Sequence, residues 1–273
     1  MTLSIATTLL CAFASETDFL LQIEAAQLPE QTVSRSLLTM GQSGHLARIP
    51  AQDGIGERIW LRANGLFEIN YSARVTPQRI DAEIAALPAL EPHLLPGETV
   101  QYLMDSRYCP ADKFHAFALA EFGELGGGAR IAAMAAWIAE NFTYTLGVSD
   151  SNTTALESFV ERRGVCRDYA HVLVTLARAS AVPARYVSVY APDVFPQDFH
   201  AVAEVFLGNP EGPGGAWHLV DPTGMAAASE MAKIGIGRDA ADVSFLTSFG
   251  NCELLDKVIT VIRHDELPRE VAA

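Results

Sequence analysis

Basic residues are scarce in this chain of 273 residues. Lysine and arginine number 19 against 33 aspartates and glutamates, so the formal net charge is −14 at pH 7. Phosphate backbones and anionic membrane surfaces would repel such a chain. The composition therefore argues against a protein that binds nucleic acid or a membrane through general electrostatics. Steering by this charge would favour neutral or basic peptides as binding partners.

Long apolar runs are also missing. No stretch reaches the roughly 18 consecutive apolar residues that a membrane-spanning helix needs. Residues 3–14 are largely apolar and end in a small-x-small triplet, as at a signal-peptide cleavage site, but no lysine or arginine occurs before Arg35. These residues are better interpreted as a strand, and we expect a cytoplasmic protein. Apolar residues still make up 49% of the chain, which is enough to fill a core.

Cysteine is limited to four scattered positions: Cys11, Cys109, Cys166 and Cys252. No Cys-x-x-Cys pair is present, so zinc ribbons and dense disulfide scaffolds are excluded. Separated cysteines are typical of reduced thiols in the cytosol.

The chain changes character along its length. Residues 1–80 contain short strand-like runs at 2–5, 17–24, 59–61 and 66–71, separated by glycines. This spacing predicts a small antiparallel β-sandwich. Residues 81–110 hold four prolines and read as a connector. We expect the remaining residues, 111–273, to form a second domain.

The second domain begins with helical patterns and continues with strands. Apolar residues recur at helical spacing over 129–142. Thr154 and Glu157 form a capping-box pattern for a helix through Arg162, ended by Gly164. A further helix is predicted over 166–181, followed by strands at 184–190, 201–207, 216–220 and 257–263. Helices followed by consecutive strands indicate an α+β fold.

Three residues stand in contexts that suit thiol chemistry. Cys166 comes two residues after Gly164 and opens a predicted helix, where the helix dipole stabilises a thiolate. His200 begins a strand and can accept the thiol proton and return it to a leaving amine. Asp221 ends a strand before Pro222 and can orient the imidazole. Taken singly, each residue type more often has a structural role.

Four sequence blocks give these residues a wider context: GVCRDYAH at 164–171, VPARYVS at 182–188, DFHAVAEV at 198–205 and WHLVDPT at 217–223. Together, in this order and spacing, they resemble the bacterial transglutaminase-like superfamily, whose members include cysteine proteases. The resemblance implies a papain/transglutaminase-like core, in which the nucleophile helix packs on an antiparallel sheet, preceded by a β domain. It assigns Cys166 as nucleophile, His200 as base and acid, and Asp221 as the orienting residue. Val202 departs from the pattern, because the family often has tryptophan there.

The predicted function is thiol-dependent acyl transfer on amide or peptide bonds, with hydrolysis, as by a cysteine protease or amidase, as the favoured outcome. Transamidation of protein glutamines is the alternative. A non-catalytic binding or scaffolding module and a redox-sensing thiol are two further interpretations. We expect a peptide or protein substrate of unknown identity, and nothing in the sequence indicates an oligomeric state.

The residues around the candidate site also bear on cofactors, on the oxyanion donors and on ion pairs. A metal centre of His200, His218 and Asp221 would consume the base, so we expect neither a metal nor another cofactor. The backbone N–H of Cys166 is one natural oxyanion donor, and the second is not identified from the sequence. Asp168 is expected to complement the helix dipole or pair with an arginine, and Arg185 to form a structural ion pair.

Overall fold

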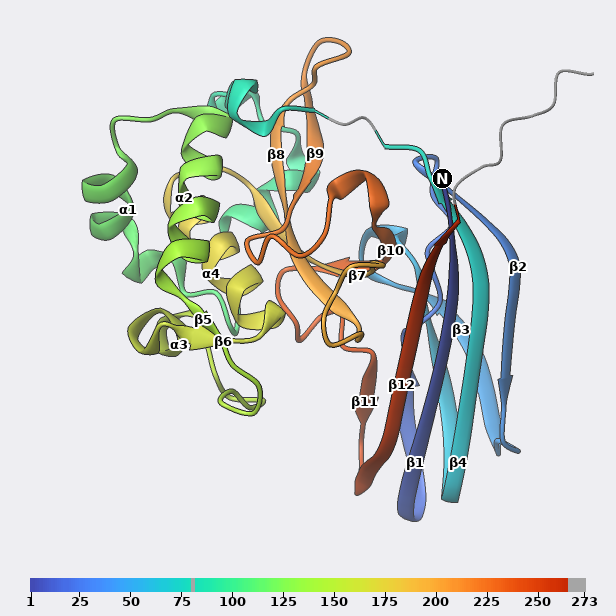
Figure 1. The fold of residues 1–273 in the computed structure, drawn as a ribbon. Coiled ribbons are helices and arrows are strands. Elements are labelled where there is room, and N and C mark those ends of the chain that lie inside the picture. Colours follow the sequence, from blue (N-terminus) through green and yellow to red (C-terminus); the bar gives the residue numbers. More distant parts are fainter. Residues whose placement is uncertain (80–81, 265–273) are drawn as a thin grey trace, which may run out of the picture.

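Two antiparallel sheets form the framework of the protein, in a computed structural model that describes residues 1–79 and 82–264 (Figure 1). The first sheet contains β1 (Thr2–Leu21), β2 (Gln31–Met40), β3 (His45–Pro50), β4 (Glu57–Pro77), β11 (Leu246–Ser248) and β12 (Cys252–His264). Its order is β11-β1-β4-β2, with β12 also pairing with β1 and β3 also pairing with β4.

The first sheet folds over on itself because its two longest strands bend. The rings of Phe13 and Phe19, both in β1, stack with centroids 4.8 Å apart. Six residues of straight strand would span about 20 Å, so the strand must reverse between them. The β1–β4 register jumps there, from Phe13 opposite Gly65 to Thr17 opposite Ala63. The result is the predicted sandwich-like domain, with alternate β1 side chains enclosed between its layers.

Two details of this domain differ from the sequence-based expectation. The run at 2–5 and residues 17–21 of the run at 17–24 belong to the single strand β1, and the runs at 59–61 and 66–71 to the single strand β4. Polar residues at the bends resemble loops in the sequence, but pairing continues on both sides of each bend. The strand predicted at 257–263, within the second domain, lies in β12 and pairs with β1 of the first sheet. The strands β1 and β12, far apart in the sequence, thus lie side by side in one sheet.

The second sheet has the order β10-β7-β8-β9. Its strands are β7 (Ala184–Tyr190), β8 (His200–Gly208), β9 (Gly215–Val220) and β10 (Ala232–Gly237). The helices are α1 (His115–Phe122), α2 (Gly127–Asn141), α3 (Ala155–Glu161) and α4 (Cys166–Ala179), and β5 (Thr143–Tyr144) pairs with β6 (Arg163–Gly164). Short 3-10 helices occupy Gln52–Gly54, Ile84–Ala86, Pro92–Leu94, Gly97–Leu103, Ala111–Lys113 and Ala228–Glu230.

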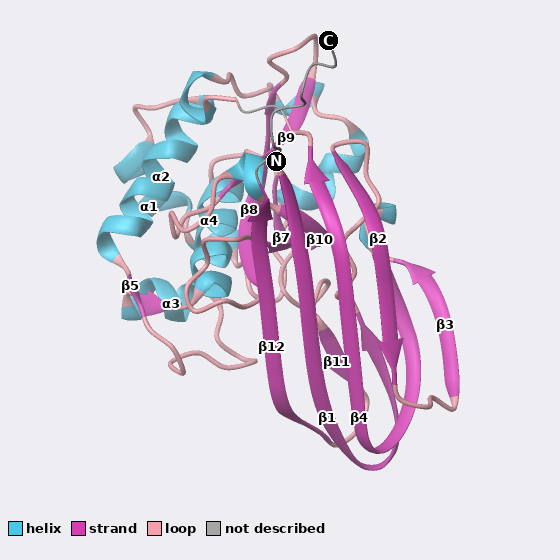
Figure 2. Cartoon of the chain, turned by 45° about the vertical axis from the view of Figure 1, so that its right-hand side comes forward, coloured by secondary structure: helices cyan, strands magenta, loops and turns pink. Residues whose placement is uncertain are grey.

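Helix α4 is the centre of this second unit. Every residue from 168 to 178 is buried, because α4 packs against β7 and β8 on one side and against α2 and α3 on others. Figure 2 shows the helices on one side of the second sheet and the first sheet on the other. The α+β class with a helix packed on an antiparallel sheet is therefore confirmed.

Local sequence signals located most elements of this unit. The capping box of Thr154 and Glu157 is present at the start of α3. The helix ends at Arg162, which adopts a left-handed conformation with φ of 55°, rather than at the predicted Gly164. Strand β10 was not predicted, because Gly235 and Gly237 weaken a strand pattern.

Candidate active site

Cys166 is the first residue of α4, directly after the N-cap residue Val165. The backbone leading into Cys166 passes through Gly164, which pairs with Tyr144 in the β5–β6 bridge. A Cβ atom on Gly164 would lie 2.5–2.8 Å from side-chain atoms of Asp168. Glycine is therefore required here, because only a residue without a Cβ atom lets the backbone come this close to the Asp168 side chain.

Asp168 holds the turn that presents the thiol. Its buried carboxylate accepts hydrogen bonds from the Val165 N–H at 2.8 Å and from the Ser149 hydroxyl at 2.7 Å. The other carboxylate oxygen accepts from Arg167 at 3.0 Å. The expected pairing of Asp168 with an arginine is confirmed, and the residue stands in the first helical turn, where a negative charge complements the helix dipole.

His200 and Asp221 are joined across the second sheet. His200 Nε2 donates to Asp221 Oδ2 at 2.9 Å, and both side chains are almost fully buried. The carboxylate also accepts from the N–H and hydroxyl of Thr223 and from the Ala226 N–H. Burial opposes ionisation of Asp221, but the hydrogen bonds from His200 and Thr223 hold the pKa of its carboxyl below the usual 3.8.

The second ring nitrogen of His200, Nδ1, has no hydrogen-bond partner among residues 1–79 and 82–264. Burial would lower the pKa of His200, but the Asp221 hydrogen bond and the neighbouring Cys166 thiol outweigh it and raise that pKa to about 10. A positively charged imidazole near the thiol stabilises a thiolate. Asp221 can therefore orient the ring while Nδ1 exchanges a proton.

Cys166 and His200 line one cavity of about 510 Å³. Its walls come from both halves of the protein, because Phe245, Leu246 and Lys257 lie in or beside strands of the first sheet. This wall could not be foreseen, since the sequence analysis assigns the residues after 240 to the second domain, whereas β11 and β12 belong to the first sheet. The structure thus brings together the three residues singled out in the sequence.

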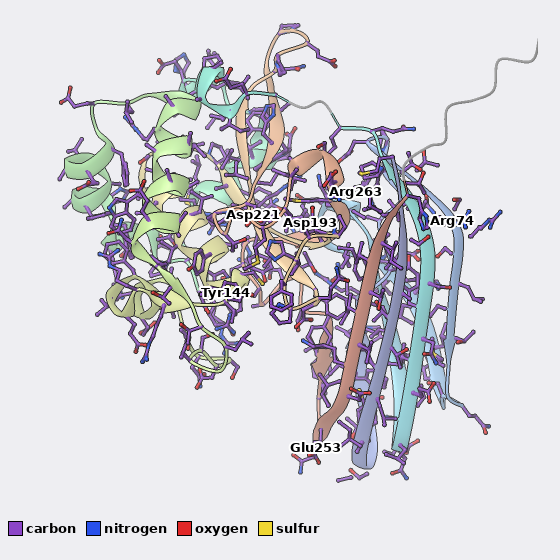
Figure 3. The ribbon with its side chains drawn as sticks, in the orientation of Figure 1. Arg74, Tyr144, Asp193, Asp221, Glu253 and Arg263 are labelled. Carbon is purple, nitrogen blue, oxygen red and sulfur yellow. The ribbon has the colours of Figure 1, made fainter. Side chains whose placement is uncertain are left out.

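Tyr144 is a further residue close to the thiol, to which the sequence analysis assigns no role. The β5–β6 register sets it opposite Gly164, two residues before the thiol, and Figure 3 labels it together with Asp221. Burial, together with the nearby Cys166 thiol, raises the pKa of Tyr144, so its hydroxyl keeps its proton. A protonated phenol is a hydrogen-bond donor. In the sequence Tyr144 is an aromatic residue at the end of a short strand, which by itself is unspecific.

Two further histidines, His171 and His218, do not line the cavity of Cys166 and His200. His171 is fully buried between Tyr108 and Tyr186, and burial lowers its pKa to about 3. His218 lines a separate cavity of about 550 Å³. Within the described part of the chain, no group of three potential metal ligands is found. The predicted ion pair of Arg185 is confirmed, at 2.7 Å from Glu204.

Burial also distinguishes the four thiols, all of which are free. It raises the pKa of Cys11 and of Cys109 to about 12, and it raises the pKa of Cys252 as well. Cys166 is the one that lines the cavity with His200.

The chain is similar in sequence and in structure to proteins of a known family. Residues 120–222 match the sequence model of the transglutaminase-like superfamily. The crystal structure of a candidate cysteine protease from Cytophaga hutchinsonii superposes with a TM-score of 0.89 at 30% sequence identity, covering 98% of this chain and 93% of that one.

Two mycobacterial proteins resemble part of the chain. An uncharacterised protein of Mycobacterium leprae is 29% identical over 119 residues, and one of Mycobacterium tuberculosis is 35% identical over 121 residues. The matches cover 42% and 40% of this chain and 42% and 38% of those proteins. The chain therefore spans about two fifths of the length of these curated relatives.

Proposed function

The chain belongs to the transglutaminase-like superfamily, and from that premise we propose that it is an enzyme of acyl transfer on amide or peptide bonds. Cys166 is the nucleophile, His200 the base and acid, and Asp221 the orienting residue. The observation that carries the proposal is the 2.9 Å His200–Asp221 hydrogen bond, which leaves Nδ1 of the same ring available beside the cavity of Cys166.

The first half of the reaction forms an acyl-enzyme. The Cys166 thiolate attacks the carbonyl carbon, and the carbonyl oxygen gains the negative charge. The C–N bond then breaks, and the amine leaves with the proton that His200 held as imidazolium. A thioester remains on Cys166.

The second half regenerates the thiolate. Water gives a proton to His200 and attacks the thioester, the C–S bond breaks, and an acid is released. If an amine attacks instead, the product is a new amide. We favour hydrolysis, and the cysteine-protease description of the Cytophaga hutchinsonii protein supports that choice. Transamidation is the alternative.

Two donors are suited to stabilise the charged oxygen. The backbone N–H of Cys166 stands at the first turn of α4, and the hydroxyl of Tyr144 lies beside it. Donors aimed at a developing oxyanion are among the largest contributors to acyl-transfer catalysis.

The substrate in this proposal is a peptide or protein, and the proposed location is the cytosol, in keeping with four free thiols. In the part of the chain that the structure describes, no helix is long and apolar enough to cross a membrane.

Trapping the thioester tests the proposal. The protein is incubated with a peptide library in H₂¹⁸O, with and without an added primary amine, and Cys166 is examined by mass spectrometry. Acyl adducts on Cys166 and ¹⁸O in the released acid support hydrolysis, whereas incorporation of the amine supports transamidation. Turnover of the same peptides by a Cys166→Ala variant would contradict the role of Cys166 as nucleophile. Absence of adducts with every peptide would favour the binding-module interpretation.

A further inference from the structure

The cavity around Cys166 carries a local charge that differs from that of the whole chain. Apart from Cys166 and His200, its charged lining residues are Arg107, Arg167, Lys257 and Asp198. Lys257 binds the carboxylate of Asp198, so these two charges largely cancel. Two guanidinium groups then dominate the lining, although acidic residues outnumber basic ones 33 to 19 in the chain.

Arg107 is exposed, and no carboxylate lies within 4.0 Å of it among the described residues. Arg167 follows the nucleophile directly and shares its Nε and one Nη group with Asp168, at 3.3 and 3.0 Å. Its other Nη group has no protein acceptor in the described ranges. Each arginine therefore keeps N–H donors that a ligand can use.

Tyr108 supports both arginines. The guanidinium carbons of Arg107 and Arg167 lie 5.0 and 5.9 Å from the centre of its ring. The Tyr108 hydroxyl donates to the Ser151 carbonyl at 2.6 Å, and its ring stacks on His171. A ring held in this way limits the positions of the two cations and lowers the entropy lost when they bind an anion.

We propose that Arg107 and Arg167 bind a carboxylate of the substrate, so that the enzyme acts on acidic peptides with Asp or Glu beside the reacting amide. The inference rests on the proposed role of Cys166 and adds a substrate class to it. Planar guanidinium groups match carboxylates by paired hydrogen bonds.

The overall negative charge does not prevent this recognition. Charges farther than about 8 Å are largely screened at physiological salt, whereas these arginines line the same cavity as the thiol. Two acids close to Arg167 are already engaged: Asp168 holds the helix start, and Asp150 accepts hydrogen bonds from the N–H groups of Asn152 and Thr153. The neutral or basic peptides expected from composition are therefore replaced by acidic ones at this site.

Three matched peptides test the proposal, with Glu, Gln or Lys next to the reacting amide. We expect the Glu peptide to have the highest kcat/KM. In Arg107→Glu its kcat/KM should fall about tenfold, while that of the Lys peptide rises. Arg74→Glu is the matched control, because Arg74 is exposed in β4 of the first sheet, away from helices α1 to α4 (Figure 3). Equal kcat/KM for the three peptides, or equal effects of the two variants, would overturn the inference.

A second readout separates this inference from the proposed function. Iodoacetate and iodoacetamide alkylate the same thiol, but only iodoacetate carries a negative charge. Peptide mapping of Cys166 should show that Arg107→Glu slows iodoacetate about tenfold and leaves iodoacetamide unchanged. If that holds while no peptide is turned over, the anion site stands and the proposed function fails. Turnover of peptides with an iodoacetate rate that ignores Arg107 would refute the anion site alone.

Discussion

His200 and Asp221 meet because of the direction of two neighbouring strands. His200 is the first residue of β8, and Asp221 follows the last residue of β9. Antiparallel pairing puts the start of one strand beside the end of the next, with Ala203 opposite Val220. Their 2.9 Å hydrogen bond therefore follows from strand register.

Loss of the nucleophile or of the orienting acid should affect turnover strongly. We expect Cys166→Ala to remove amide turnover, and Asp221→Asn to lower kcat by at least about 100-fold, because the imidazole loses its charged partner. Cys252→Ser is the matched control, since Cys252 does not line the same cavity. Initial rates on one peptide measure all three, and full activity in Asp221→Asn would contradict the role given to that residue.

Alkylation should be selective for one thiol. Burial raises the pKa of Cys11 and of Cys109 to about 12, so neither forms thiolate near neutral pH. At pH 7, iodoacetamide should label Cys166 first, as read by peptide mass mapping. At pH 6 the labelling rate should be lower in His200→Ala than in the parent, because the imidazolium no longer stabilises the thiolate. Equal rates at pH 6 would mean that the two residues are not coupled.

Protonation of His200 should contribute to stability in a pH-dependent way. Its pKa in the folded protein, about 10, lies above the ordinary value of 6.5. The folded state therefore binds this proton more tightly, and the resulting stability is fully present below about pH 6.5 and lost as the pH rises toward 10. Urea unfolding of the parent and His200→Gln at pH 6, 8 and 10 should show a shrinking difference in free energy. A constant difference would argue against the raised pKa.

The Tyr144 hydroxyl should matter for turnover and not for thiol reactivity. Removal of one oxyanion donor costs about 100- to 1000-fold in kcat in other acyl-transfer enzymes. We expect Tyr144→Phe to lower kcat by at least about tenfold, while its iodoacetamide labelling at Cys166 stays near that of the parent. A parallel loss of both would indicate that the ring merely positions the start of α4.

Gly164 should tolerate no larger residue. A Cβ atom there would overlap Asp168, so Gly164→Ala should lower the free energy of unfolding by about 1–3 kcal/mol. Gly97→Ala is the control, because no atom lies within 4 Å of a Cβ built at that position. Denaturant midpoints measure both, and equal midpoints would show that Asp168 can move aside.

Local patterns predicted much of the second unit. The helical spacing of Ile131, Met134 and Ile138 indicated the buried face of α2, and all three are fully buried. The capping box of Thr154 and Glu157 located the start of α3 to within one residue. These features depend on interactions between residues three or four apart, which a sequence displays directly.

Other features were beyond such patterns. The polar interruption in β1 reads as a loop, and only the β1–β4 register shows a single strand that bends. Strand β12 pairs with β1 across nearly the whole length of the chain, and no local signal specifies a partner so distant. Arg162 ends α3 in a left-handed conformation that glycine would normally take.

The sequence by itself determined the α+β class and the helix start at Cys166, because both depend on residue type and short spacing. The three residues of the candidate site came from residue type together with the resemblance of four sequence blocks to a known family. Tertiary structure decided that β11 and β12 form part of the wall facing the thiol, that Tyr144 lies beside it, and that Arg107 and Arg167 share one ring. These relationships join residues far apart in the chain. They arise only when burial of apolar surface packs the two sheets and the helices together.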